Sequence, residues 1–237
     1  MPHRMTVTER GLSAPRSGAM SRMIGRRAVL AAGAALVARR ATAGLPVPQG
    51  DSLAFRMVRH GNPIGTHALT FQHDGDRLTV QIAVDALVTL LSIPIARYHH
   101  HAVETWQGTT LVGLSGETNK NGARQWINAQ RTDEGLVVLG SQTRRYVAPD
   151  AAIPTSYWNQ RMLDGPMISL EDGVLLSPKV TVLQADKVRL ASGSMIVATH
   201  YNLSGSFNVD VWYDQTRTWA GMAMTVADGS EVRYERL

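Results

Sequence analysis

Residues 97–106 form a run in which titratable and aromatic side chains alternate, with the sequence RYHHHAVETW. In an extended strand every second side chain shares a face, so Tyr98, His100, Glu104 and Trp106 would lie on one side. An imidazole and a carboxylate that are buried together shift each other's pKa values, and such a pair can transfer protons as general acid and base. This face is therefore the first candidate for chemistry.

His100 and Glu104 cannot form that pair with each other. They stand four residues apart, roughly 13 Å along a strand, so each needs a partner on a neighbouring strand. The next two strands offer such partners: Glu117, Asn119, Arg124, Trp126 and Asn128. The catalytic alternative combines His100 with Glu104 or Glu117. A polar cluster in a barrel is more often a structural network or a ligand-orienting patch, so we assign no catalytic residue.

The opposite face of the same run holds His99 and His101, about 6.6 Å apart along the backbone. Two imidazoles at that spacing could share a metal ion if another strand supplied further ligands. The other histidines beyond residue 43 are isolated in the sequence, so we predict no metal site and identify no cofactor. The chain has no cysteine, which excludes thiolate metal sites, a cysteine nucleophile and a lipid-anchored lipoprotein.

The elements that must position these residues are strands. Apolar residues recur at every second position, as in residues 53–57 and 80–84, and turn signals such as Asn121-Gly122 separate the runs. We predict a mainly β fold: a single antiparallel β-barrel or half-barrel meander with one short helix from Pro154 to about Leu163. Residues 84–93 fit either a long strand or a helical turn that stops before a proline.

Residues 1–43 have the parts of an export signal in the usual order. Arg22, Arg26 and Arg27 form a positive region, and the apolar stretch that follows is too short to span a bilayer of about 30 Å. A small-residue cleavage site then precedes Gly44. The pair Arg26-Arg27 resembles the twin-arginine motif, although Gly25 stands where Ser or Thr is usual. An ordinary secretory signal is the alternative.

We therefore predict a helical or disordered twin-arginine signal peptide over residues 1–43 and a single antiparallel β domain over residues 44–237. The precursor's partner would be the twin-arginine translocation machinery, and the domain would be periplasmic. Residues 1–19 need not be translated, because a start at Met20 or Met23 gives a more typical leader.

The positive charge of the chain is concentrated in the leader. The net charge is +5, but 8 of the 24 Lys and Arg residues and 1 of the 19 acidic residues precede Gly44. The remaining 16 basic and 18 acidic residues leave the domain near −2. Nucleic-acid binding needs a cationic face, so we exclude it. No later segment has the ~20 apolar residues of a membrane helix, so we expect no stable membrane insertion.

Several motifs occur in an order that resembles an uncharacterised family of exported bacterial proteins, a domain of unknown function. They are residues 98–106 (YHHHAVETW), 117–122 (ETNKNG), 154–159 (PTSYWN), 212–214 (WYD) and 228–230 (DGS). The resemblance implies an exported β fold and supplies no catalytic residues. More distantly, the pattern is similar to the β half-barrels that carry lipoproteins or lipids between membranes, a likeness of architecture only.

Our leading hypothesis is a periplasmic binding or carrier protein for a small, partly apolar or lipid-like ligand. Aromatic walls with a few polar groups are typical of such sites. The predicted lining consists of Tyr98, His100, Glu104, Trp106, Trp126 and Trp158. Two alternatives stay open: a periplasmic enzyme that uses His100 with a carboxylate, and a structural envelope protein that has a filled core and no ligand.

Overall fold

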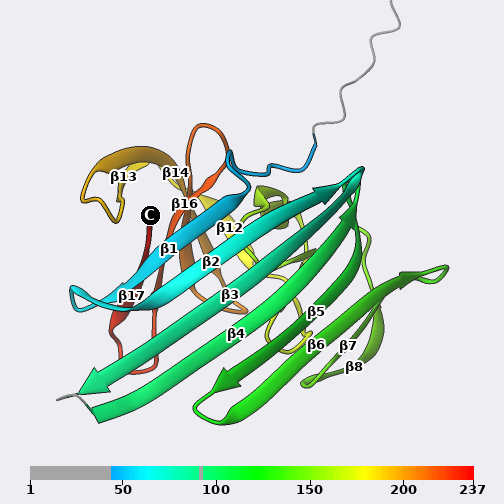
Figure 1. Cartoon of the computed structure of the whole chain (residues 1–237), viewed down its shortest axis with the longest axis horizontal. Coiled ribbons are helices and arrows are strands. Elements are labelled where there is room, and N and C mark those ends of the chain that lie inside the picture. The colour runs from blue at the N-terminus through cyan, green and yellow to red at the C-terminus, as the bar shows by residue number, and fades with distance from the viewer. Residues whose placement is uncertain (1–43, 91–92) are drawn as a thin grey trace, which may run out of the picture. The chain divides into compact units, whose positions relative to one another are not determined.

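One antiparallel sheet of 14 strands makes up most of the domain (Figure 1). The structure is a computed structural model that describes residues 44–90 and 93–237, so the predicted leader at residues 1–43 lies outside the described residues. The first strands are β1 (Ser52–Arg59), β2 (Asn62–Asp74), β3 (Arg77–Leu90), β4 (Ile93–Gln107), β5 (Thr110–Lys120), β6 (Ala123–Thr132), β7 (Gly135–Gly140) and β8 (Thr143–Ala148). The last are β12 (Lys179–Val182), β13 (Asp186–Arg189), β14 (Met195–Ser204), β15 (Val209–Tyr213), β16 (Trp219–Thr225) and β17 (Glu231–Arg236).

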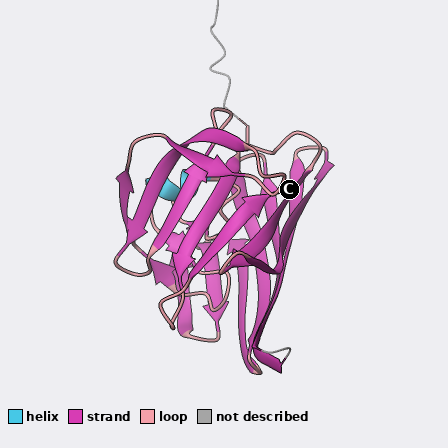
Figure 2. Ribbon diagram, turned by 90° about the vertical axis from the view of Figure 1, so that its left-hand side faces the viewer, coloured by secondary structure: helices cyan, strands magenta, loops and turns pink. Residues whose placement is uncertain are grey.

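The strands follow one another as a meander. β1 to β8 pair in sequence, β14 to β17 do the same, and β17 joins the two series by pairing with β1. β12 and β13 both pair with β14, and the sheet ends at β8 and β12 without closing (Figure 2). The predicted half-barrel meander is thus confirmed. Residues 84–90, which fitted either strand or helix, continue β3.

The sheet has an inner and an outer face because buried and exposed side chains alternate along its strands. In β2, His67, Leu69 and Phe71 are buried, whereas Thr70 and Gln72 between and beyond them are exposed. The period of two that predicts strands from the sequence therefore also assigns each side chain to a face.

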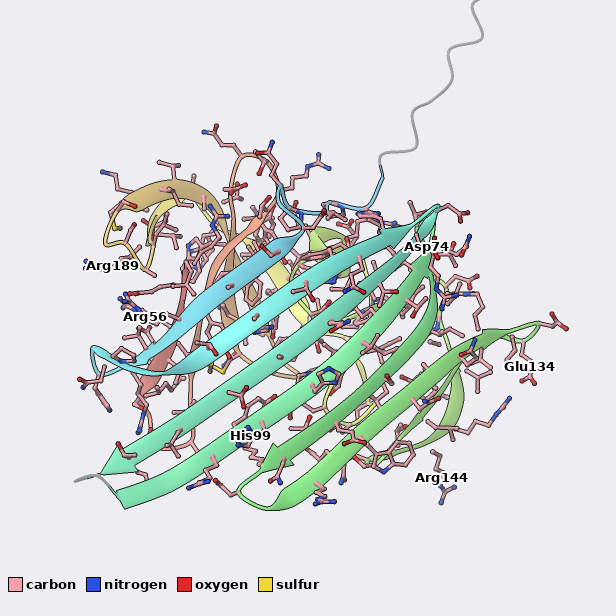
Figure 3. All side chains as sticks on the ribbon, in the orientation of Figure 1. Arg56, Asp74, His99, Glu134, Arg144 and Arg189 are labelled. Carbon is pink, nitrogen blue, oxygen red and sulfur yellow. The ribbon has the colours of Figure 1, made fainter. Side chains whose placement is uncertain are left out.

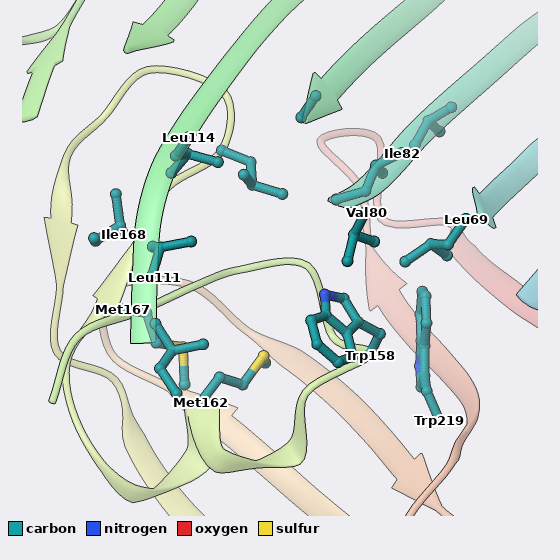
Figure 4. Packing of buried hydrophobic residues seen from close by; sticks show 14 of the residues in the cluster. Leu69, Val80, Ile82, Leu111, Leu114, Trp158, Met162, Met167, Ile168 and Trp219 are labelled. Carbon is teal, nitrogen blue, oxygen red and sulfur yellow. The ribbon is translucent and has the colours of Figure 1, made fainter. Parts of the chain in front are cut away.

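Residues 149–176, here called the inner segment, lie against the inner face. This segment contains β9 (Ile153–Pro154), the 3₁₀ helix η1 (Gln160–Asp164), β10 (Met167–Ile168) and β11 (Leu175–Leu176). Trp158, Met162 and Ile168 are fully buried among side chains of the sheet such as Val80 and Leu111 (Figure 4). Full burial of each such side chain contributes roughly 1.5–3 kcal/mol. The chain thus fills the concavity of its own sheet.

The predicted helix at 154–163 is shorter and tighter than expected. Pro154 belongs to β9, where it pairs in parallel with Ile168, and Tyr157 has a φ of 63°, which no right-handed helix can contain. Helical structure begins only after Asn159, whose side chain accepts a hydrogen bond from the Arg161 amide. Among residues 44–90 and 93–237, no helix is long and apolar enough to cross a membrane.

Two glycines of the sheet let the inner segment approach closely. A Cβ atom on Gly116 in β5 would lie 2.8 Å from the carbonyl oxygen of Leu170, and one on Gly140 in β7 would lie 2.0 Å from that of Asp172. Both contacts involve backbone atoms, which cannot turn aside as a flexible side chain can. The fit of the inner segment therefore depends on the absence of a side chain at these positions.

We expect Gly140→Ala to destabilise the domain by about 1–3 kcal/mol, the usual cost of overpacking, because the new methyl group must displace the backbone at Asp172. The matched control is Gly113→Ala, where the nearest neighbour of the added Cβ atom would lie 3.6 Å away. Urea unfolding of both variants gives the comparison. Equal stabilities would show that the inner segment does not rest on the sheet in this way.

Candidate functional site

Five of the six predicted site residues lie on the inner face. Strand alternation in β4 places Tyr98, His100, Glu104 and Trp106 there, and the inner segment contributes Trp158. Glu104 is 0% exposed, Trp106 and Trp158 are 1% exposed, and only Tyr98 is half-buried. Most of this group is therefore sealed from solvent by the chain itself.

The Glu104 carboxyl group links β4 to the inner segment. Its Oε2 atom accepts hydrogen bonds from Trp106 Nε1 at 2.8 Å and from Trp158 Nε1 at 3.0 Å. The two indole rings meet edge to face, with centroids 5.8 Å apart. Burial raises the pKa of Glu104, and the neighbouring Ser156 hydroxyl and the two indole N–H groups oppose that rise without cancelling it. Glu104 Oε1 and Ser156 Oγ are both buried without a hydrogen-bond partner among the described residues.

His67 and His100 lie in one row across the inner face, because both are in register with Val84 of β3. His100 Nδ1 is 2.8 Å from Thr118 Oγ1, whereas neither ring nitrogen of His67 has a hydrogen-bond partner among the described residues. Burial, and then the proximity of His100, lowers the pKa of His67 to about 3. Burial and His101 lower the pKa of His100 to about 4.

Tyr98 lies at the end of this face that is closest to solvent. Its hydroxyl donates a hydrogen bond to Glu171 Oε1 of the inner segment at 2.8 Å. Burial and the Glu171 carboxylate raise the pKa of Tyr98 far above its ordinary value, and burial acts in the same direction on Tyr157 and Tyr234. All the shifts described on this face thus favour uncharged forms, whereas a general acid or base works best with a pKa near the working pH.

The structure does not bring Trp126, the sixth predicted residue, to the inner face. Residues in register across β4, β5 and β6 share a face, and Trp126 is in register with Glu117, which is in register with His101. All three are therefore on the outer face, where Trp126 is 45% exposed. The sequence analysis assigned Trp126 to the same lining as Tyr98, but the register depends on the β4–β5 and β5–β6 turns, which a residue pattern does not specify.

A hollow of about 670 Å³ opens on the outer face around Trp126. Two rows of residues cross it: Ala83, His101, Glu117 and Trp126 form one, and Asp85, His99, Asn119 and Arg124 form the other. The methyl side chain of Ala83 leaves the hollow open at β3. Figure 3 shows His99 on this outer face, where its Nδ1 contacts the carboxylate of Asp85. Sequence analysis missed Ala83 and Asp85, since only the register reveals them.

The backbone beneath the hollow is held firmly. Trp126 donates its amide proton to Ser141 Oγ at 3.1 Å, and its carbonyl oxygen accepts from the Ser141 amide at 2.9 Å. The indole ring is thus carried on a doubly bonded position of β6 rather than on a loop. Within the described part of the chain, no group of three or more His, Asp or Glu side chains is arranged to hold a metal ion.

A family model for a domain of unknown function, DUF6134, matches residues 55–237. The chain belongs to this family. The match runs from β1 to the end of the chain and includes both the inner-face row and the outer hollow. The expected membership in an uncharacterised domain family is confirmed. No curated protein matches the chain.

The buried histidines make the DUF6134 domain sensitive to acid. Their pKa values are lower in the folded domain than the ordinary 6.5, so the unfolded chain binds protons more readily below pH 6.5. Between pH 7.5 and 5, His67 should lower the free energy of unfolding of the wild type by about 2 kcal/mol. We expect the His67→Phe variant to lose about that much less stability over the same range. Urea unfolding across this range tests the effect, with the exposed His60→Gln as control. Parallel pH profiles for wild type and His67→Phe would contradict it.

Glu104 has the opposite pH dependence. Because its folded-state pKa is raised above 4.5, its contribution to stability is complete below that pH and declines as the pH rises toward the folded value. We expect Glu104→Gln, which keeps an oxygen acceptor for the indoles, to gain stability relative to wild type from pH 5 to pH 9. Glu104→Ala, which loses both hydrogen bonds, should be less stable throughout. A Glu104→Gln difference that stays constant with pH would show that this carboxyl group is not buried neutral.

Proposed function

We propose that this DUF6134 domain is a ligand-binding protein of the bacterial envelope, and that its ligand sits in the outer hollow around Trp126. The observation that carries the proposal is a large exposed indole, fixed on a rigid strand, beside a row of hydrogen-bonding side chains. The volume of about 670 Å³ lies within the range of about 300–1,000 Å³ that small-molecule sites occupy.

The inner face offers less room for a ligand than the sequence predicts. The inner segment covers it, and Trp106 and Trp158 serve as packed partners of each other and of Glu104. Of the residues predicted to line the inner face, only His100 borders one of the three hollows, and Tyr98, Glu104, Trp106 and Trp158 border none of them. The ligand-binding hypothesis is therefore kept, and its site moves to the outer hollow.

A second candidate keeps the ligand on the inner face. Its support is His67, whose two buried ring nitrogens are unpaired with respect to the described residues. A buried polar group of this kind calls for a water molecule or a ligand. In this version Tyr98 and Glu171 form the entrance, and the domain is a carrier whose inner segment moves aside when a small, partly apolar ligand enters.

An enzyme that uses His100 with a carboxylate has weaker support. Glu117 lies on the opposite face, and one carboxylate oxygen of Glu104 is occupied by two indole N–H groups. With a pKa of about 4, His100 also gains protons poorly at neutral pH. A purely structural envelope protein agrees with the filled inner face but leaves the exposed Trp126 without a role.

The proposed location is the periplasm. Its support is the leader pattern: paired arginines, a short apolar stretch and a small-residue cleavage site. The near-neutral charge of the remaining chain suits a protein that acts on a ligand rather than on nucleic acid.

Native mass spectrometry of the full chain, purified from bacteria without chelator, tests the proposal. We expect an added mass that denaturation removes, that Trp126→Ala eliminates, and that Trp212→Phe retains, because Trp212 stacks on His200 outside the hollow. An added mass lost in Tyr98→Phe and kept in Trp126→Ala would instead assign the ligand to the inner face. A bare chain under all conditions would leave the structural role as the better account.

A further inference from the structure

The hollow around Trp126 is the central part of a longer trough on the outer face. A second hollow of about 530 Å³ shares His99 and Asn119 with it, and a third of about 310 Å³ shares His101, Glu117 and Trp126. The shared lining residues show that the three hollows are adjacent along this face. The trough follows β4 from Ile95 to His101, which is six residue steps or about 20 Å along a strand.

An elongated trough fits a chain-like ligand better than a single small molecule. A peptide strand is a poor occupant of the middle of the trough, because β4 from Tyr98 onward pairs with both β3 and β5, and β5 pairs with both β4 and β6. Recognition there must therefore come from side chains. The occupant needs groups that side chains can bind at regular intervals along its length.

The side chains of the trough are suited to hydroxyl groups. Three side-chain amides line it: Asn119, Asn121 and Asn128. Asn119 Oδ1 accepts from the Gly122 amide and Asn121 Oδ1 from the Arg97 amide, which fixes both side chains with their NH₂ groups as donors to a ligand. Carboxylates and guanidinium groups add acceptors and donors that can each bind two neighbouring hydroxyls.

The charges of the trough favour an uncharged occupant. Asp85 and Glu117 supply two carboxylates, and Arg97 and Arg124 supply two guanidinium groups. A polyanion such as nucleic acid needs a cationic excess, which these four residues do not provide. Trp126 adds a flat apolar surface, and the C–H groups on one side of a sugar ring form a matching apolar face.

We propose that the outer trough binds an uncharged polysaccharide chain, with Trp126 stacked on one sugar ring and the flanking amides and carboxylates bound to the hydroxyls of its neighbours. This inference rests on the proposed function, because it names the ligand class of the same site. It places the domain on the glycan material of the cell envelope or on a glycan that crosses the periplasm.

The test is isothermal titration of the full chain with cellohexaose, chitohexaose and maltohexaose and with the matching disaccharides. We expect at least one hexaose to bind at least about tenfold more tightly than its disaccharide, because only the hexaose spans the trough. Trp126→Ala should weaken that binding at least about tenfold, while Trp212→Phe should leave it unchanged. Between about 0.05 and 0.5 M salt the affinity should change less than about twofold, as for an uncharged ligand.

Three outcomes would overturn the inference. The first is the absence of binding to all three hexaoses, and the second is tighter, salt-dependent binding of the anionic polymer polygalacturonate. The third is a dimer in light scattering that Trp126→Ala dissolves, which would assign the trough to a second copy of the chain. The polysaccharide inference can fail while the proposed function survives: a non-saccharide mass in native spectra that depends on Trp126 would refute the polysaccharide and keep the ligand site.

Discussion

The Glu104 carboxyl group stands at the centre of the inner face and accepts hydrogen bonds from one indole of the sheet and one of the inner segment. A buried indole N–H group without a hydrogen-bond partner would be costly, so the shared acceptor, one Glu104 oxygen atom, fixes where both tryptophan rings lie. Trp158 in turn fixes the inner segment over the sheet, and Gly116 and Gly140 allow that segment to pack at backbone distance. The filling of the concavity beside Trp106 depends on this arrangement.

Much of the fold follows from residue patterns alone. The alternation in residues such as Leu69 and Phe71 is a local property, and it correctly indicates strands and the buried side of each. The path of the inner segment is not local: Tyr157, in a left-handed conformation, stacks on Trp219 of β16, and Pro154 pairs with a strand 14 residues away. Such contacts are set by tertiary packing, so the motif at 154–159 indicates a helix that the fold replaces with a strand and a 3₁₀ turn.

In the candidate site too, the local features are predictable from the sequence and the features set by tertiary packing are not. The shared face of Tyr98, His100, Glu104 and Trp106 follows from their spacing within one strand, and the structure has it as predicted. The position of Trp126 required knowledge of how β6 is shifted against β4, and a shift of one residue exchanges the two faces. The outer hollow also needs Ala83, whose contribution is the space that its small side chain leaves. Neither the register of the strands nor the space beside a small side chain can be predicted from a single sequence.

The sheet does not close on itself: β8 forms one edge, and β12 and β13, which both pair only with β14, form the other. An edge strand offers its free backbone groups to any other strand that approaches, which makes a large open sheet prone to pairing with further copies. β8 carries the exposed Arg144 and also Arg145, which pairs with Glu134, and β12 carries the exposed Lys179. Two copies that approached edge to edge would bring like charges together at the moment of contact. The cationic ends thus act as gatekeepers against fibrous self-association, and the fold keeps a broad binding surface without the protection of a closed barrel.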